Sequence, residues 1–512
     1  MSFRFVGGQL GLLLLVLSGV IALVGIGSAM AYVSGHEAEH AACGALLLTA
    51  SIGAALGLAL WWTGRRVQDR LGRREALLLV AMSWLFGAAL SALPFRLWAA
   101  GAQGVPDDHA FRRYVDCYFE AMSGLTTTGA TVLTQIATVP DSLLLWRAAT
   151  QWLGGLGIIV LFVAVLPSLG VGGKRVFRIE SPGPTPEGVR PKIQETARVL
   201  WLIYVGVSLA EILALRVLGM TWFESACHSF ATMATGGFST RDPSVAAFHS
   251  AAIDTVIIVF MLLAGVNFGV YYQAIRGRWR TAWRDPELRV YLGVILLGFF
   301  VVAVPLLTHG MHTTTGDRVD PSWRSAVRYG LFQTVSIQTT TGFCTADFNQ
   351  WPAVCRTVLV LLMFAGASAG STGGGVKIVR CMIVAKVLWA ELERVFRPNV
   401  VRVVRIGPVA VDSELRLATL AYVFMVFLLF VAGGIALLLL ERDNGIDVVT
   451  ALTASAATLN NIGPGLGLVG ATGNYAWFSE AGKVVMSLLM VLGRLEVFTI
   501  AVLFVPRFWM RE

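Results

Sequence analysis

The sequence has little charge and few of the residue patterns that build metal or redox sites. Only 14% of its 512 residues are charged, whereas a soluble protein usually carries about a quarter. Its six cysteines include no Cys-x-x-Cys pair, and its seven histidines include no His-Glu-x-x-His motif. These absences argue against a zinc site or a redox dithiol and leave open only a disulfide between Cys344 and Cys355. No nucleophile and base stand together either, so we do not expect an enzyme.

Long apolar runs dominate the chain instead. Hydrophobic residues make up 56% of it, and runs such as 10–33 and 417–440 exceed the roughly 20 residues that cross a bilayer as a helix. The first run is too long for the core of a signal peptide, so we expect it to remain as a span. The sequence therefore predicts an all-α polytopic membrane protein. Its expected spans are 9–33, 41–63, 75–98, 142–169, 197–219, 250–274, 288–308, 353–386, 414–440 and 476–506.

The formal net charge of +9 is concentrated in short loops between these runs. Because cytoplasmic loops collect arginine and lysine, the distribution predicts cytoplasmic N- and C-termini and contact with anionic lipid, and it argues against nucleic acid as a partner. The basic loops are 64–74, 172–180, 276–289 and 394–405.

Four polar interruptions recur at intervals of about 110 residues, the signature of an internal repeat. Each contains a glycine and follows an amphipathic stretch too short to span a membrane. The interruptions are "LTTTGATV" (125–132), "MATGGFST" (233–240), "IQTTTGFC" (337–344) and "TLNNIGPGLG" (458–467), and the stretches before them are 112–125, 222–233, 324–337 and 446–459.

The repeat predicts four units of span, pore half-helix, filter loop and span, arranged around a central pore. Two additional transmembrane helices precede them. The expected domains are 1–68 for the additional helices, then pore repeats at 69–175, 190–280, 285–398 and 410–512.

The chemistry of the four loops suits a dehydrated monovalent cation. A ring of main-chain carbonyls can replace the water shell of such an ion, and glycine supports the ring because it adopts positive φ without a Cβ clash. The partial negative charge at the half-helix C-termini favours a cation at the centre, whereas a divalent ion would need several carboxylates. The candidate ion ligands are Thr127, Thr128, Gly129, Thr235, Gly236, Thr340, Thr341, Gly342, Asn461, Ile462 and Gly463.

The motifs "SGLTTTGAT", "ATGGFST", "TTTGF", "GSTGGGVK", "NNIGPG" and "GRLEVFT" resemble those of the Trk/Ktr/HKT superfamily of potassium transporters, most closely the membrane subunits of bacterial Trk systems. The resemblance covers nearly the whole chain. It implies that potassium is the transported ion, without a cofactor, and that Gly129, Gly236, Gly342 and Gly463 are the filter glycines. Some plant relatives that favour sodium have serine at the first of these positions, so Gly129 implies a preference for potassium. The resemblance further implies a bacterial inner-membrane homodimer with a cytosolic nucleotide-binding regulatory subunit, a TrkA-like ring.

A glycine-rich stretch, "GASAGSTGGGVKIVR" (366–380), interrupts the eighth expected span. It is not a phosphate-binding loop, because Val376 separates Gly375 from the lysine and no Ser or Thr follows. Since glycine disfavours helix by about 1 kcal/mol relative to alanine, we expect a broken helix, and the superfamily resemblance implies a gating loop; a static kink is the alternative. The expected gate residues are Gly370, Ser371, Thr372, Gly373, Gly374, Gly375 and Lys377.

Arg494, deep in the last expected span, is the second element of the expected gate. A buried arginine is costly in a membrane and usually lines a wet path or has a partner. A fixed positive charge below the filter would slow the exit of cations. The alternatives are snorkelling to the interface or a pair with Glu496, although residues two apart point to different helix faces.

Other charges have less certain roles. Asp242 and Asp347 follow the second and third loops and would form an acidic pore mouth or simply cap their loops. Arg147, Glu211 and Asp254 lie near or within spans, where we expect them to pair or to anchor the interface, with their partners left open. The function classes that remain are a gated potassium-selective pathway, a proton- or sodium-coupled potassium symporter, and a sodium or ammonium pathway.

Overall fold

The computed structural model describes residues 2–65, 72–160, 189–400 and 402–510. Nearly all regular structure in these ranges is helical, which confirms the predicted fold class. The basic loop 172–180 and the end of the fourth expected span lie outside the described residues. Cys344 and Cys355 are both free thiols, so the disulfide left open by the sequence is not formed.

Long helices are interspersed with short ones along the chain. The α-helices are α1 Phe3–Val33, α2 Glu39–Gly64, α3 Arg73–Gly101, α4 Tyr114–Leu125, α5 Asp141–Val160, α7 Val189–Val217, α8 Trp222–Met233, α9 Ala251–Ala264, α10 Phe268–Ile275, α11 Trp279–Trp283, α12 Pro286–Leu306, α13 Trp323–Gln338, α14 Ala353–Phe364, α15 Ile378–Phe396, α16 Ser413–Leu440, α17 Val448–Leu459, α18 Glu480–Arg494, α19 Phe498–Ala501 and α20 Pro506–Trp509.

Short elements join these helices. The 3-10 helices are η1 Ala110–Arg112, η2 Ile136–Thr138, η5 Ser244–Phe248, η6 Phe348–Gln350, η7 Arg442–Asn444, η8 Gly467–Val469 and η9 Val502–Phe504. The two antiparallel strand pairs are β1 Met311–His312 with β2 Arg318–Val319, and β3 Arg405–Ile406 with β4 Val409–Ala410.

Six described helices are long and apolar enough to cross a membrane: α1, α2, α3, the Ala197–Val217 part of α7, α12 and α16. They correspond to the first, second, third, fifth, seventh and ninth expected spans. The sixth and tenth expected spans are not straight helices, since α9 and α10 meet at 93° and α18 meets the α19–η9 segment at 113°. The eighth is divided into α14 and α15 by the glycine-rich stretch, as expected.

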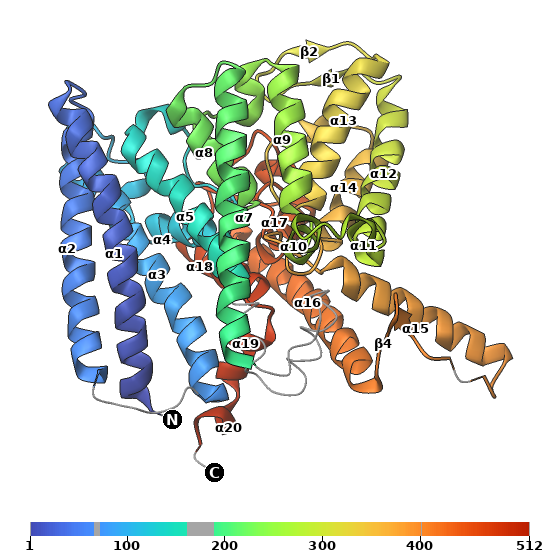
Figure 1. Cartoon of the computed structure of the whole chain (residues 1–512). Coiled ribbons are helices and arrows are strands. Elements are labelled where there is room, and N and C mark those ends of the chain that lie inside the picture. Colours follow the sequence, from blue (N-terminus) through green and yellow to red (C-terminus); the bar gives the residue numbers. More distant parts are fainter. Residues whose placement is uncertain (1, 66–71, 161–188, 401, 511–512) are drawn as a thin grey trace.

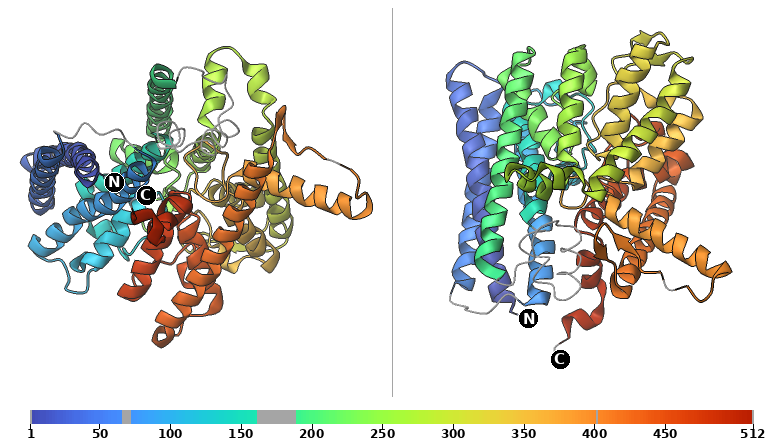
Figure 2. Two further views of the ribbon diagram at one scale, coloured as in Figure 1. Left: turned by 90° about the horizontal axis from the view of Figure 1, so that it is seen from below. Right: turned by 45° about the vertical axis from the view of Figure 1, so that its right-hand side comes forward.

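The additional N-terminal helices form a tight pair at one edge of the molecule (Figures 1 and 2). Gly8 lies so close to Gly64 that a Cβ at position 8 would stand 3.0 Å from the Gly64 Cα. Small residues at such positions let membrane helices approach closely. At the opposite edge α15 extends away from the body, and both chain ends lie at the same end of the molecule (Figure 1).

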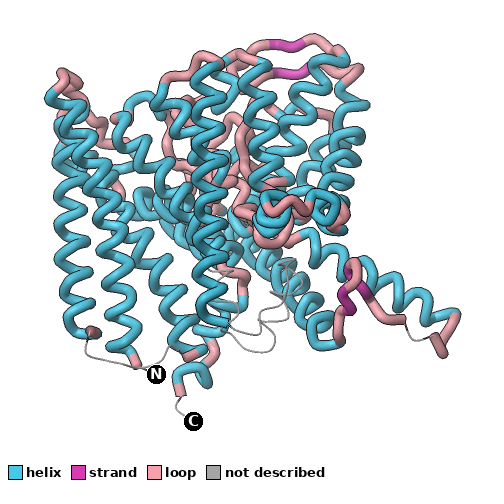
Figure 3. The backbone as a smooth tube through the Cα atoms, in the orientation of Figure 1, coloured by secondary structure: helices cyan, strands magenta, loops and turns pink. Residues whose placement is uncertain are grey.

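The four short helices predicted as pore half-helices are α4, α8, α13 and α17, and three of them, α8, α13 and α17, begin at a side-chain cap. Thr221 and Ser322 form capping boxes at α8 and α13, while the Asp447 carboxylate accepts from the Thr450 N–H at the start of α17. Each helix ends directly before its polar loop. These loops run between the helices, inside the bundle (Figure 3), where irregular backbone must be enclosed by protein or line a cavity.

Candidate functional site

The four loops share one backbone conformation. In each, the residue two before a glycine has positive φ, and the glycine itself has positive φ. The pairs are Thr127 and Gly129 (54° and 80°), Thr235 and Gly237 (55° and 73°), Thr340 and Gly342 (61° and 81°), and Asn461 and Gly463 (55° and 94°). Positive φ is uncommon outside glycine, so its recurrence at matching positions supports four related units.

Hydrogen bonds repeat with the same spacing. The N–H of the residue before each glycine bonds the carbonyl five residues earlier, at the end of the pore helix. These bonds are Thr128 to Ser123, Gly236 to Ala231, Thr341 to Ser336 and Ile462 to Ala457, with N···O distances of 2.8, 2.8, 2.9 and 2.8 Å. They fix each loop at the C-terminus of its helix, where the helix dipole is negative.

Both patterns correct one detail of the sequence alignment. The counterpart of Gly129 is Gly237, and Gly236 corresponds instead to Thr128. Gly129, Gly237 and Gly342 are partly accessible, whereas Gly236 is buried. Gly236 remains within the second loop, so its carbonyl is still a candidate ion ligand.

The loops close into a ring. A Cβ at each of these glycines would meet the carbonyl oxygen of the residue before the glycine in the next loop. The contacts run from Gly129 to Gly236, from Gly237 to Thr341, from Gly342 to Ile462, and from Gly463 back to Thr128. Every side chain larger than hydrogen at these positions would therefore displace the neighbouring backbone, which explains why all four are glycine.

Polar side chains hold the ring from behind. The Thr126 and Thr128 hydroxyls lie 2.8 Å apart, as do those of Thr339 and Thr341. Asn461 connects loops, because its Nδ2 donates to the Thr128 Oγ1 at 3.0 Å and to a carbonyl of α18. The hydroxyls of Thr126, Thr128, Thr339 and Thr341 are thus engaged in the scaffold, whereas the buried Thr127 hydroxyl has no partner among the described residues.

The sequence analysis missed two residues that bond the loops. Gln151 of α5 donates from Nε2 to the Gly236 carbonyl at 2.6 Å, and its Oε1 accepts from the Phe238 N–H at 3.2 Å. The Tyr475 hydroxyl donates to the Gly463 carbonyl at 2.7 Å. Gln151 lies 85 positions from Gly236 in the sequence, so no local motif marks it, whereas Tyr475 lies only 12 positions after Gly463.

Two of the three charges left open by the sequence have partners in the structure. Arg147 pairs with the buried Glu120 of α4, with Nε and Oε1 2.5 Å apart, and donates to the Ser239 carbonyl at 3.0 Å. It therefore connects the first repeat to the second loop. Asp254 pairs with Arg328 at 2.6 Å. The carboxylate oxygens of Glu211 are buried without a hydrogen-bond partner among the described residues.

A buried ion pair connects the fourth repeat to the first. The Lys483 ammonium of α18 lies 2.5 Å from the Asp116 carboxylate of the α4 pore helix, with side chains 1% and 4% exposed. Lys483 also donates to the Ala476 carbonyl at 2.8 Å. Because this pair lies where α18 of the last repeat meets α4 of the first, we expect it to stabilise the closure of the ring.

Removing one partner of a buried ion pair costs about 3–5 kcal/mol, because the other charge stays buried. We expect Lys483→Met to lower the thermal denaturation temperature of the detergent-purified protein by about 5 °C or more. Lys386→Met, at an exposed lysine, is the matched control and should change it little. Adding Asp116→Asn to Lys483→Met should recover part of the loss; no recovery would contradict the pairing.

Asp347 caps its own loop, whereas Asp242 connects the second loop to the segment that follows the first loop. Asp242 accepts from the Ile136 N–H at 2.7 Å, and Asp347 accepts from the Asn349 N–H at 3.1 Å and from the Gln350 amide at 2.7 Å. Asp347 thus has the capping role that the sequence left open. Their contribution to an acidic pore mouth stays a prediction.

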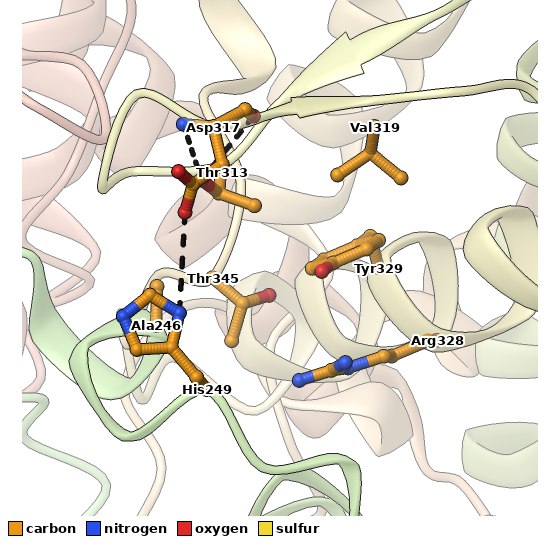
Figure 4. A pocket seen from close by; sticks show the side chains of 8 residues that line it. All are labelled: Ala246, His249, Thr313, Asp317, Val319, Arg328, Tyr329 and Thr345. Atoms are coloured by element: carbon orange, nitrogen blue, oxygen red, sulfur yellow. Dashed lines mark hydrogen bonds and ion pairs between the residues drawn. The ribbon is translucent and has the colours of Figure 1, made fainter.

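A pocket lies near the β1–β2 pair, and none of the four ring glycines lines it. Figure 4 shows His249, Asp317 and Arg328 around it, with a His249–Asp317 distance of 3.9 Å. Neither Asp242 nor Asp347 lines it. Its charges include both signs, so it does not itself form an acidic mouth.

The glycine-rich stretch is an extended loop between α14 and α15, folded against the loops of the ring. Its two arms, the segments next to α14 and next to α15, are joined by a hydrogen bond from the Gly366 N–H to the Val376 carbonyl, with an N···O distance of 2.9 Å. The Gly374 N–H donates to the Thr340 hydroxyl at 2.6 Å, and a Cβ at Gly373 would lie 3.1 Å from the Thr339 carbonyl. The stretch therefore contacts the third loop of the ring directly, at the end of α13.

Arg494 is 3% exposed and holds this loop. Its Nη1 donates to the Thr372 carbonyl at 2.7 Å and its Nη2 to the Gly154 carbonyl at 3.4 Å. Lys377 donates to the Gly373 carbonyl. Glu496 pairs with Arg380 at 2.6 Å, so the alternative of an Arg494–Glu496 pair is not what the structure contains.

A small cavity lies beside these charges. It is lined by Gly373, Gly374, Gly375, Lys377, Tyr422, Gly493, Arg494 and Glu496. The structure thus brings together the two elements that the sequence assigned to a gate, next to the filter loops.

Four pore helices that end at one ring of glycine loops define a class of membrane transport protein. Residues 47–511 match the model of the TrkH family, described as cation transport protein. The chain belongs to this family, so the expectation that it is not an enzyme is confirmed.

Named relatives extend the match over the full length. The chain is 38% identical to the Trk system potassium uptake protein TrkH of Salmonella typhimurium and 37% identical to that of Escherichia coli K12, in each case over 99% of this chain and 100% of the relative. The crystal structure of the potassium transporter TrkH from Vibrio parahaemolyticus superimposes with a TM-score of 0.85 at 33% identity, covering 100% of both chains.

Proposed function

We propose that this chain takes up potassium through the ring of four loops. The observation that carries the proposal is the closed contact from each glycine to the carbonyl of the next loop. Main-chain oxygens from two positions in each loop would replace the hydration shell of the ion. The first position is Thr127, Thr235, Thr340 and Asn461, and the second is Thr128, Gly236, Thr341 and Ile462. The relatives named potassium uptake proteins support potassium as the ion.

The loop 370–375, Lys377 and Arg494 form the gate of this pathway. They lie against the third filter loop, and Arg494 holds the loop in place through the Thr372 carbonyl. A buried guanidinium on the path would repel cations, and the loop itself would occupy the exit. Release of the loop opens the gate.

The membrane is the bacterial inner membrane, with both termini in the cytoplasm. Support comes from the arginine-rich loops and from the two chain ends at one end of the molecule (Figure 1). A homodimer regulated by a TrkA-like nucleotide-binding ring is the assembly implied by the superfamily resemblance.

The test is growth of a bacterium that lacks its own potassium uptake systems. The chain should restore growth at potassium concentrations too low for the host alone. Gly342→Val is the matched inactive control, because its side chain would displace the Ile462 carbonyl. If the chain does not restore growth although it reaches the membrane, the proposal is wrong.

One observation favours a second candidate, proton-coupled potassium symport. Glu211 is a buried carboxyl on α7 without a hydrogen-bond partner among the described residues, and intramembrane carboxyls serve as proton sites in transporters. Measuring the reversal potential in proteoliposomes separates the candidates. A value that follows the potassium gradient alone indicates a gated pathway, and a value that shifts with the pH gradient indicates symport.

A further inference from the structure

The segment that joins α9 to α12 holds the glycine-rich gating loop at several points. The Ser368 N–H donates to the Gly265 carbonyl at 3.0 Å, and the Phe268 N–H donates to the Gly370 carbonyl at 3.1 Å. The Thr372 hydroxyl donates to the Ala264 carbonyl at 3.2 Å. A single stretch of chain therefore fixes the part of the loop that Arg494 also contacts.

Glu287, in the first turn of α12, completes this attachment. Its Oε1 accepts from the Ala369 N–H at 2.7 Å and from the Val379 N–H at 3.1 Å, and the residue is 6% exposed. One carboxylate oxygen thus joins both arms of the gating loop to the start of α12. Hydrogen bonds to a charged acceptor are stronger than those between neutral groups, so Glu287 holds both arms of the loop firmly.

Between these attachment points the segment has an exposed basic and aromatic surface. Trp279 and Trp283 are 61% and 63% exposed. Arg276, Arg278, Arg280 and Arg284 are exposed beside them, and residues 276–284 contain no Asp or Glu. We call residues 276–284 the connector.

The connector has the geometry of an interfacial element. Helix α10 lies at 93° to α9. A chain that crosses the membrane along α9 therefore turns in α10 to run parallel to the membrane surface. Tryptophan is enriched where the bilayer meets water, and clustered arginine there binds anionic lipid headgroups. The arginines and tryptophans of the connector therefore match one chemistry, that of an anionic membrane surface.

We propose that the connector binds anionic phospholipid headgroups and that Glu287 transmits this binding to the gating loop. The headgroups fix the connector, Glu287 keeps both arms of the loop in place, and the loop stays within reach of Arg494. Anionic lipid thus lowers flux by favouring the closed loop. This inference rests on the proposed function, because it assumes that the loop gates ion flow.

The test uses the full purified chain in two kinds of proteoliposome, one of phosphatidylcholine alone and one of equal parts of phosphatidylcholine and phosphatidylglycerol. We expect potassium flux to be about fivefold or more lower with phosphatidylglycerol, the lower end of typical coupling between two sites. Equal flux in both would overturn this inference. Absence of flux in both would overturn the proposed function instead.

Variants separate binding from transmission. Replacing Arg276, Arg278, Arg280 and Arg284 together by glutamine should abolish the response to phosphatidylglycerol. Arg4→Gln with Arg65→Gln, at an exposed arginine of α1 and an exposed arginine directly after α2, is the matched control and should retain it. If the connector variant responds like the wild type, the inference is wrong.

Glu287→Ala should raise flux and remove its dependence on lipid, yet leave lipid binding intact. Binding is read from quenching of Trp279 and Trp283 fluorescence by brominated phosphatidylglycerol, taken as the difference from a Trp279→Phe, Trp283→Phe variant. Quenching that does not prefer brominated phosphatidylglycerol to brominated phosphatidylcholine would overturn the headgroup assignment. So would an equal flux response to soluble glycerol phosphate in phosphatidylcholine vesicles.

Discussion

Gly129→Ser is expected to lower the preference for potassium over sodium by about tenfold or more. Gly129 has a φ of 80°, and a Cβ there would meet the Gly236 carbonyl oxygen. A left-handed conformation costs a non-glycine residue about 1–2 kcal/mol, and a change of about 1.4 kcal/mol in relative affinity is tenfold. Bi-ionic reversal potentials with potassium and sodium on opposite sides of the membrane measure this preference.

Two further variants locate the effect in the ring. Gly237→Ser should reduce the preference as Gly129→Ser does, because Gly237 has a φ of 73° and its Cβ would meet the Thr341 carbonyl. Gly44→Ser is the matched control, since a Cβ at that position has nothing within 4 Å. An unchanged preference in both ring variants would place selection of the ion elsewhere.

The broad architecture followed from the sequence because it depends on features that recur. Hydropathy identified the long helices, and the repeated interruptions identified the four pore helices within two residues of their observed ends. The second loop was misaligned because "TGG" offers two adjacent glycines. Only the backbone shows that Gly237, not Gly236, has positive φ.

The breaks in the sixth and tenth expected spans were not predicted, because hydropathy stays high across them. Asn267 is the N-cap of α10, and its side-chain oxygen accepts from the Gly269 N–H at 2.7 Å. After Arg494, Glu496 and Val497 adopt positive φ of 57° and 47°, which a β-branched residue rarely does. Tertiary contacts with the glycine-rich stretch 366–380 hold both breaks, and such contacts leave no mark in local sequence.

The residues that support the site from a distance were missed for a related reason. Gln151 and Glu287 bond backbone groups more than eighty positions away in the chain, so their role depends on which segments pack together. The charged residue Arg494 was identified because an arginine in an apolar run is itself unusual. Its partner carbonyl at Thr372 could not be inferred in the same way.

Arg494→Ala is expected to raise potassium flux by roughly ten- to a hundredfold. Arg494 donates to the Thr372 carbonyl at 2.7 Å, and a hydrogen bond from a charged group contributes about 1.5–3 kcal/mol. Each 1.4 kcal/mol or so changes an equilibrium constant about tenfold, here that between the closed and the open loop. The substitution removes both this bond and the positive charge beside the loop. Rubidium uptake into proteoliposomes, normalised to the amount of protein, measures the change.

Arg494→Lys distinguishes the two contributions of the arginine. Lysine retains the positive charge but lacks the planar fork that reaches both the Thr372 and Gly154 carbonyls. Flux close to that of Arg494→Ala would indicate that the arginine acts as a latch on the loop, and flux close to the wild type would indicate an electrostatic barrier. Deleting residues 370–375 should raise leak in either case, because the obstruction itself is gone. Lower flux in Arg494→Ala than in the wild type would contradict a gating role for the arginine altogether.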